Sequence, residues 1–98
     1  MDIRVQSVKF DADSKLLDFV DKKVGKLAKF YDEIIKIEVT LALLPDAASN
    51  KEVKIRVYIP GKDLYIDRNA STFEDAVVDC VDVLKEQVVK IKEKKAGK

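Results

Sequence analysis

Hydrophobic residues recur along this chain with two different periods, and each change of period marks the start of a new element. Alternation of apolar and polar residues over 2–9, 34–44, 52–59 and 64–67 predicts four strands, each with one covered face. Apolar residues three or four positions apart over 15–31 and 71–95 predict two amphipathic helices. The predicted order of elements is therefore β-α-β-β-β-α.

The same pattern assigns side chains to a single core and suggests where the helices begin. Asp13 or Ser14 is expected to cap the first helix, and Ser71 or Thr72 the second. Loops are expected at 45–50 and 60–63. The residues expected to face the core are Ile3, Val5, Leu17, Val20, Val24, Leu27, Tyr31, Ile35, Ile37, Val39, Leu41, Leu43, Val53, Ile55, Val57, Ile59, Leu64, Ile66, Phe73, Val77, Cys80, Val81, Leu84, Val88 and Ile91.

The connections between these elements predict the topology. Short loops make the last three strands an antiparallel meander, whereas the helix between the first two strands is a crossover that makes them parallel. Both helices must cover the one apolar face of the sheet. We expect an α+β two-layer sandwich with a four-stranded mixed sheet, similar to double-stranded RNA-binding domains. Residues 1–98 form one domain, and we expect fraying from about 93 to 98.

The composition argues against an enzyme. The chain contains no histidine, its three glycines are far apart, and its single cysteine, Cys80, lies on the apolar stripe of a helix. We therefore expect no catalytic site, metal, cofactor or small-molecule substrate. No apolar run approaches the ~20 residues that span a bilayer. The start of the chain has no signal-peptide pattern, so the expected location is the cytoplasm.

Positive charge is concentrated in two places of a nearly neutral chain. From Lys85 to the end, six lysines and two glutamates give a net charge of +4, whereas the preceding residues carry −3. Lys22, Lys26 and Lys29 share the far side of the first helix. If the helices lie side by side, these lysines are expected to join Lys85, Lys90 and Lys92 in one basic surface suited to phosphates. The alternative is a solvated helix face with cations that oppose the helix dipole.

Other surfaces remain open as binding sites. The free face of the sheet is expected to carry Lys54, Arg56, Tyr58 and Tyr65, with Arg4 and Lys36 nearby, and aromatic rings between cations can stack bases. The alternative function is a protein-interaction module that binds its partner through an exposed sheet edge or through an acidic stripe on the second helix. The residues of this stripe are Asp75, Asp79, Asp82 and Glu86.

Three segments resemble one known family, and their order and spacing extend the resemblance over essentially the whole chain. They are 22–34 (KKVGKLAKFYDEI), 1–6 (MDIRVQ) and 82–94 (DVLKEQVVKIKEK). These segments are similar to the ribosome hibernation promoting factors, a family that includes the ribosome-associated inhibitor protein and the sigma-54 modulation proteins.

The resemblance implies a short family member, a stationary-phase or stress factor that binds the small ribosomal subunit. Such a factor occupies the mRNA–tRNA channel near the decoding centre and blocks initiation. By matching position, the RNA-contacting residues implied are Lys23, Lys26, Lys90, Lys92 and Lys94. The charge pattern adds Lys22, Lys29 and Lys85.

Overall fold

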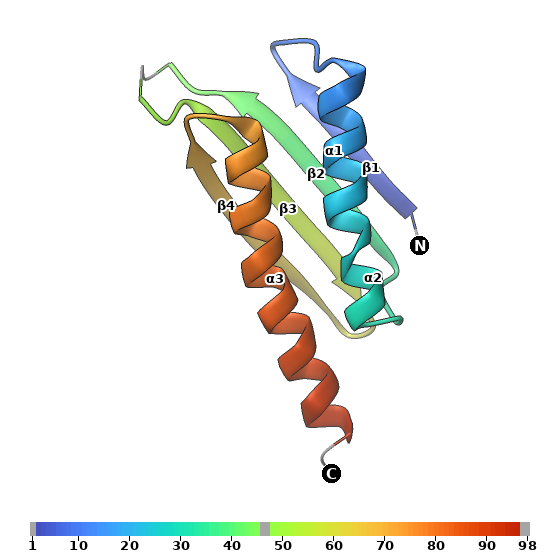
Figure 1. Ribbon diagram of the computed structural model, residues 1–98. Coiled ribbons are helices and arrows are strands. Elements are labelled where there is room, and N and C mark those ends of the chain that lie inside the picture. Colours follow the sequence, from blue (N-terminus) through green and yellow to red (C-terminus); the bar gives the residue numbers. More distant parts are fainter. Residues whose placement is uncertain (1, 46–47, 97–98) are drawn as a thin grey trace.

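The computed structural model describes residues 2–45 and 48–96 of the protein and confirms the predicted element order (Figure 1). The strands are β1 (Asp2–Val8), β2 (Lys36–Leu43), β3 (Lys51–Ile59) and β4 (Lys62–Ala70). The helices are α1 (Ser14–Gly25), α2 (Leu27–Phe30) and α3 (Phe73–Ala96). Residues 46–47 of the expected loop and 97–98 of the expected frayed end lie outside the described residues.

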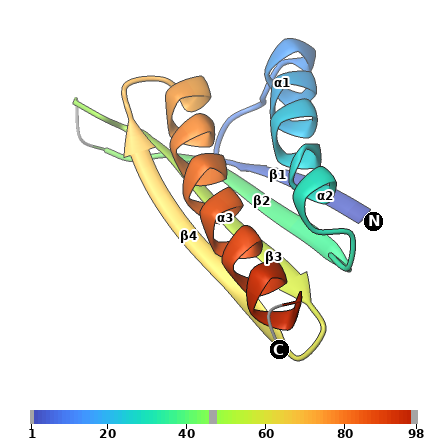
Figure 2. The ribbon, with the colours of Figure 1, turned by 60° about the horizontal axis from the view of Figure 1, so that its bottom comes forward.

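The four strands form one mixed sheet in the order β1-β2-β3-β4. β1 runs parallel to β2, with Ile3 opposite Ile37, and the other two pairings are antiparallel. The helices α1, α2 and α3 all lie on the same face of this sheet (Figures 1 and 2). The predicted α+β two-layer sandwich with both helices on one face is therefore confirmed.

The core lies between the sheet and the helices. The predicted residues Val53, Ile55, Val57 and Ile59 of β3 are all buried, and so is the apolar stripe of α3 from Phe73 to Val88 apart from Val81, which is partly buried. Cys80 is part of this core, as expected, and Ala76 belongs to it although the sequence did not single it out. Phe10 stacks on Phe73, with ring centroids 5.0 Å apart, and closes one end of the core.

Three residues expected in the core are exposed. Ile35 and Leu43 are 58% and 41% exposed, and Leu17 is 37% exposed. Ile35 and Leu43 flank the middle of β2, so the helices cover the centre of this strand but not its ends. Ile34 is buried in place of Ile35, because the chain is not yet in the regular strand at that point.

The N-caps of α1 and α3 are residues that were expected from the sequence. The Asp13 carboxylate accepts a 2.9 Å hydrogen bond from the Leu16 N–H, and the Thr72 hydroxyl accepts one of 3.1 Å from the Asp75 N–H. These bonds satisfy amide groups that lack a partner in the first turn of a helix. Asp13 and Thr72 are thus the N-cap residues.

Two elements differ most from the prediction. The first helix is interrupted at Lys26, whose N–H bonds the carbonyl of Lys23 at 3.3 Å and tightens the turn there. β4 is nine residues long and continues to Ala70, well beyond the expected end at residue 67. The polar end of β4 pairs with β3, where Ala70 lies opposite Lys51. This end remains a strand because the backbone hydrogen bonds between the two strands do not depend on side-chain polarity.

Candidate nucleic-acid interface

A groove of about 320 Å³ lies between the first helical segment and α3. Lys23, Lys26 and Phe30 line it from α1, the Lys26 turn and α2. Val78, Val81, Asp82 and Lys85 line it from α3. The structure thus brings together three of the eight predicted RNA-binding lysines, Lys23, Lys26 and Lys85.

Aromatic rings beside the groove help to position two of these ammonium groups. Lys85 Nζ lies 4.7 Å from the ring centroid of Phe30, and Lys23 Nζ lies 5.6 Å from that of Phe19. Such cation–π contacts contribute about 0.5–1 kcal/mol at exposed sites. They keep the apolar stems of the lysines on the protein surface while the charged ends remain in water.

Only two of the four predicted lysines of the first helical segment line the groove. Lys26 lies in the tightened turn between α1 and α2 and lines the groove together with the half-buried Lys23. Lys22 and Lys29 are exposed and do not line it. The expected row of Lys22, Lys26 and Lys29 is therefore divided.

The lysines of α3 lie on two different flanks of the helix. Lys90 lines a separate hollow of about 380 Å³ with Lys62 and Tyr65 of β4. At about 100° per residue, Lys94 follows Lys90 on this flank, whereas Lys92 follows Lys85 on the groove flank. The expectation that Lys85, Lys90 and Lys92 share one surface is thus wrong for Lys90.

Lys62 is a cation of the basic surface that the sequence did not suggest. It lies at the start of β4 and lines the same hollow as Lys90, on the side of α3 away from the groove. The two residues are far apart along the chain, so no local pattern connects them. Only the packing of α3 against β4 brings them together.

None of the eight predicted lysines forms an ion pair with any residue that the structure describes. Seven of them are exposed, and Lys23 is half-buried. Their positive charge is consequently available to a ligand. The residues are Lys22, Lys23, Lys26, Lys29, Lys85, Lys90, Lys92 and Lys94.

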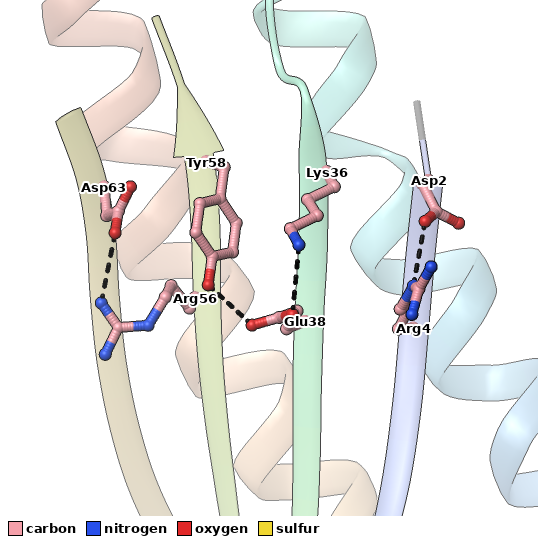
Figure 3. Close-up of polar contacts among 7 residues, drawn as sticks. All are labelled: Asp2, Arg4, Lys36, Glu38, Arg56, Tyr58 and Asp63. Carbon is pink, nitrogen blue, oxygen red and sulfur yellow. Dashed lines mark hydrogen bonds and ion pairs between the residues drawn. The ribbon is translucent and has the colours of Figure 1, made fainter. Parts of the chain in front are cut away.

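The open face of the sheet has the opposite character, because its cations are paired with carboxylates (Figure 3). The pairs are Arg4–Asp2 at 3.1 Å, Lys36–Glu38 at 3.4 Å, Lys54–Glu52 at 3.9 Å and Arg56–Asp63 at 3.5 Å. Exposed pairs of this kind add little stability. They do neutralise the face, which is therefore poorly suited to attract phosphates.

The tyrosines of this face also contact neighbouring charged side chains. The Tyr58 hydroxyl donates a 2.8 Å hydrogen bond to Glu38, and Lys36 Nζ lies 4.7 Å from the Tyr58 ring centroid (Figure 3). The hydrogen bond from Tyr58 lowers the pKa of the Glu38 carboxyl and raises the pKa of the Tyr58 hydroxyl. Arg56 lies 5.0 Å from the ring centroid of Tyr65. These contacts favour a self-contained polar network over a base-stacking platform.

The acidic stripe of α3 is fully exposed. Asp75, Asp79, Asp82 and Glu86 form no ion pair with the described residues. Asp82 also lies at the rim of the groove, where it offsets one of the three lysine charges. The groove keeps a net positive charge.

Other kinds of site find no support in the part of the chain that the structure covers. No group of three or more His, Cys, Asp and Glu residues is placed there to hold a metal ion. Burial raises the pKa of the Cys80 thiol to about 12, so it is not an activated nucleophile. None of the described helices is long and apolar enough to cross a membrane.

Two solved structures with the same fold are proteins of Thermus thermophilus and Coxiella burnetii. The crystal structure of the N-terminal domain of Thermus thermophilus Protein Y superimposes with a TM-score of 0.79 at 23% identity, covering 93% of this chain and 99% of that one. A ribosomal subunit interface protein from Coxiella burnetii superimposes with a TM-score of 0.82 at 22% identity, covering 94% and 98%. At this level of identity the likeness establishes the fold.

A comparison with curated proteins gives no match. The family described as sigma 54 modulation protein / S30EA ribosomal protein matches residues 3–96, nearly the whole chain. The resemblance noted from three short segments is thereby confirmed, and the assignment agrees with the expectation of a protein without catalytic activity. The chain therefore belongs to the sigma 54 modulation protein / S30EA ribosomal protein family, a family of non-catalytic ribosome-binding factors.

Proposed function

We propose that this protein binds the small ribosomal subunit and blocks initiation by occupying the mRNA–tRNA channel near the decoding centre. Its lysines on α1, α2 and α3 contact phosphates of ribosomal RNA. The observation that carries this proposal is a contrast between the two layers. The eight predicted lysines on the helical layer form no ion pair with the described residues, whereas the cations of the sheet face are paired. A protein with one charged face and one neutral face binds RNA in a defined orientation.

Two further observations support a ribosomal partner. The family includes proteins described as S30EA ribosomal proteins, and the similar protein from Coxiella burnetii is described as a ribosomal subunit interface protein. Inhibition by occupancy requires no reacting group, which agrees with a chain that contains no histidine. In the cell, such a factor acts in the cytoplasm on idle ribosomes, as in stationary phase or stress.

The basic surface predicts how binding depends on salt. Each lysine that meets a phosphate releases bound counterions, so the logarithm of the binding constant falls linearly with the logarithm of salt concentration. For several contacts, the affinity falls by about 10³-fold or more between low and moderate salt. An apolar protein interface would respond weakly to the same change.

Co-sedimentation with 30S and 70S ribosomes on sucrose gradients, at low and moderate salt, tests the proposal. Two triple variants remove charge from different parts of the helical layer. Lys23→Ala, Lys26→Ala and Lys85→Ala remove it from the groove, and Lys90→Ala, Lys92→Ala and Lys94→Ala remove it from the C-terminal part of α3. Both are expected to bind more weakly and with a shallower salt dependence.

A third variant provides the matched control. Arg4→Ala, Lys36→Ala and Lys54→Ala remove the same charge from the sheet face and should leave binding nearly unchanged. A native chain that remains at the top of the gradient at both salt concentrations would overturn the proposal. Loss of binding in the control as large as in the helix variants would show that net charge alone, and no defined surface, drives association.

The exposed acidic stripe of α3 supports a second candidate, a module that binds a basic protein. In this case Asp79→Ser with Asp82→Ser should weaken ribosome binding, whereas the phosphate-binding proposal predicts equal or tighter binding of this variant. The same gradients therefore separate the two functions.

A further inference from the structure

The groove between the helices combines apolar side chains with cations that form no ion pair with the described residues. Phe30, Val78 and Val81 supply its apolar side chains, and Lys23, Lys26 and Lys85 surround them. The hollow lined by Lys62 and Lys90 also combines them, but it has two lysines where the groove has three. The hollow at the start of the two helices is instead lined by Asp11, Asp13 and Glu74 with a single lysine. A third hollow, over β1 and β2, contains Arg4, which is already paired with Asp2.

Phosphate binding alone does not require the apolar part of this groove. Val78 is 37% exposed at the border between the groove and the acidic stripe of α3, and Phe30 is only partly buried. Phosphates are bound by charge and hydrogen bonds, to which valine and phenylalanine contribute nothing. A ligand that uses the whole groove must combine a flat apolar body with negative charges on either side of it.

We propose that this groove takes one unstacked nucleotide of single-stranded RNA. The base lies on Phe30, Val78 and Val81, and the flanking phosphates contact Lys23, Lys26 and Lys85. A volume of about 320 Å³ lies at the small end of ligand pockets, in the range suited to a single small group. Unstacked bases commonly pack on aromatic side chains between cations.

The position of Lys85 is compatible with this arrangement. Its ammonium lies 4.7 Å from the Phe30 ring centroid and covers the ring in the absence of a ligand. An exposed cation–π contact is weaker than the stacking of a base on the same ring. An incoming base can displace the ammonium, which is then free to meet the adjacent phosphate.

The charges favour RNA over an acidic peptide as the occupant. Three lysines face one carboxylate, Asp82, so the net charge of the groove complements the two phosphates that flank one base. These lysines stand on both helices, as required to contact a backbone on either side of the base. The inference rests on the proposed function, because it specifies what one part of the basic surface recognises.

Fluorescence anisotropy with two labelled probes tests the inference. One probe is a single-stranded oligoadenylate of about ten nucleotides, and the other is an abasic strand with the same number of phosphates. The native protein should bind the oligoadenylate at least about fivefold more tightly, the lower limit of what stacking one base contributes. Val78→Ser and Phe30→Leu should abolish this preference while leaving the affinity for the abasic strand unchanged.

Two controls make the result specific. Leu43→Ser changes an apolar residue of similar exposure outside the groove and should retain the preference. Lys85→Gln should weaken binding of both probes. Val78 is exposed, so its substitution leaves the fold intact even if Phe30→Leu does not.

Equal affinity of the native protein for the two probes would overturn the inference, and so would an unchanged preference in Val78→Ser. Co-sedimentation of the same preparation with 30S subunits separates this failure from failure of the proposed function. Ribosome binding without base preference would reject only the nucleotide groove. Absence of both would reject the ribosomal function as well.

Discussion

The Tyr58 hydroxyl donates a 2.8 Å hydrogen bond to Glu38 Oε1 and joins the neighbouring strands β3 and β2 on the open face of the sheet. Lys36 pairs with the other oxygen of the same carboxylate at 3.4 Å. The hydrogen bond from Tyr58 and, to a lesser degree, the contact with Lys36 hold the pKa of Glu38 below its ordinary value of 4.5, against an opposing effect of desolvation. The open face is thus a connected polar surface and not a row of independent cations.

This bond predicts an acid-dependent contribution to stability. A carboxyl whose pKa is lower in the folded state stabilises the fold while it is ionised, above its unfolded pKa, and loses that effect as the pH falls through the folded pKa. We expect the free energy of unfolding to decline below pH 4.5 and to decline less in Tyr58→Phe. Urea unfolding at pH 7 and at pH 3 measures both.

Tyr65→Phe is the matched control for this measurement. Its hydroxyl bonds Asp67 at 3.3 Å and does not contact Glu38, so the variant should follow the acid response of the native protein. An identical acid response in Tyr58→Phe and Tyr65→Phe would contradict the role assigned to the Tyr58–Glu38 bond.

Cys80 is expected to be unreactive in the folded protein. Its sulfur is buried, lies 3.8 Å from the carbonyl oxygen of Val53, and has a pKa raised to about 12 by burial. A thiol reagent such as Ellman's reagent should therefore label the native chain only as fast as the fold opens, and label it at once in urea. Rapid stoichiometric labelling under native conditions would contradict this.

Gly25 and Gly61 are expected to respond in opposite ways to alanine. A Cβ added at Gly25 would meet Ile3 Cδ1 at 3.7 Å, an ordinary contact, so Gly25→Ala should stabilise the protein by about 0.4–1 kcal/mol. Gly61 has open space around it but a φ of +86°, so Gly61→Ala should destabilise by about 1–2 kcal/mol. Chemical unfolding of the two variants provides the comparison, and a destabilised Gly25→Ala would refute the first part.

The N-cap of α3 makes a separate prediction. Thr72→Ala removes the hydroxyl that accepts the Asp75 N–H and should destabilise the protein by about 1 kcal/mol. Ser71→Ala changes the adjacent hydroxyl, which does not cap the helix, and should shift stability by no more than about 0.5 kcal/mol. Equal effects of the two substitutions in thermal unfolding would remove Thr72 from the capping role.

Sequence periodicity predicted much of this fold because it reports which side of an element a residue occupies. The alternation in β3 identified Val53, Ile55 and Val57 as buried, and the capping residues limited the helix starts to two candidates each. It could not predict how far the helical layer extends over the sheet, which left Leu43 exposed at the end of β2, nor that the chain before β2 buries Ile34 and exposes Ile35. Coverage depends on the neighbouring layer and not on the strand itself.

The sequence by itself determined the order of the elements, the single core and the presence of lysines on the outer faces of the helices, because these depend on residue type and local spacing. Only the tertiary structure decided which lysines meet. Packing of α3 against the first helical segment places Lys85 with Lys23 and Lys26, and packing against β4 places Lys90 with Lys62. A helical period fixes directions around one axis, whereas contacts between residues distant in sequence depend on how two elements are set against each other.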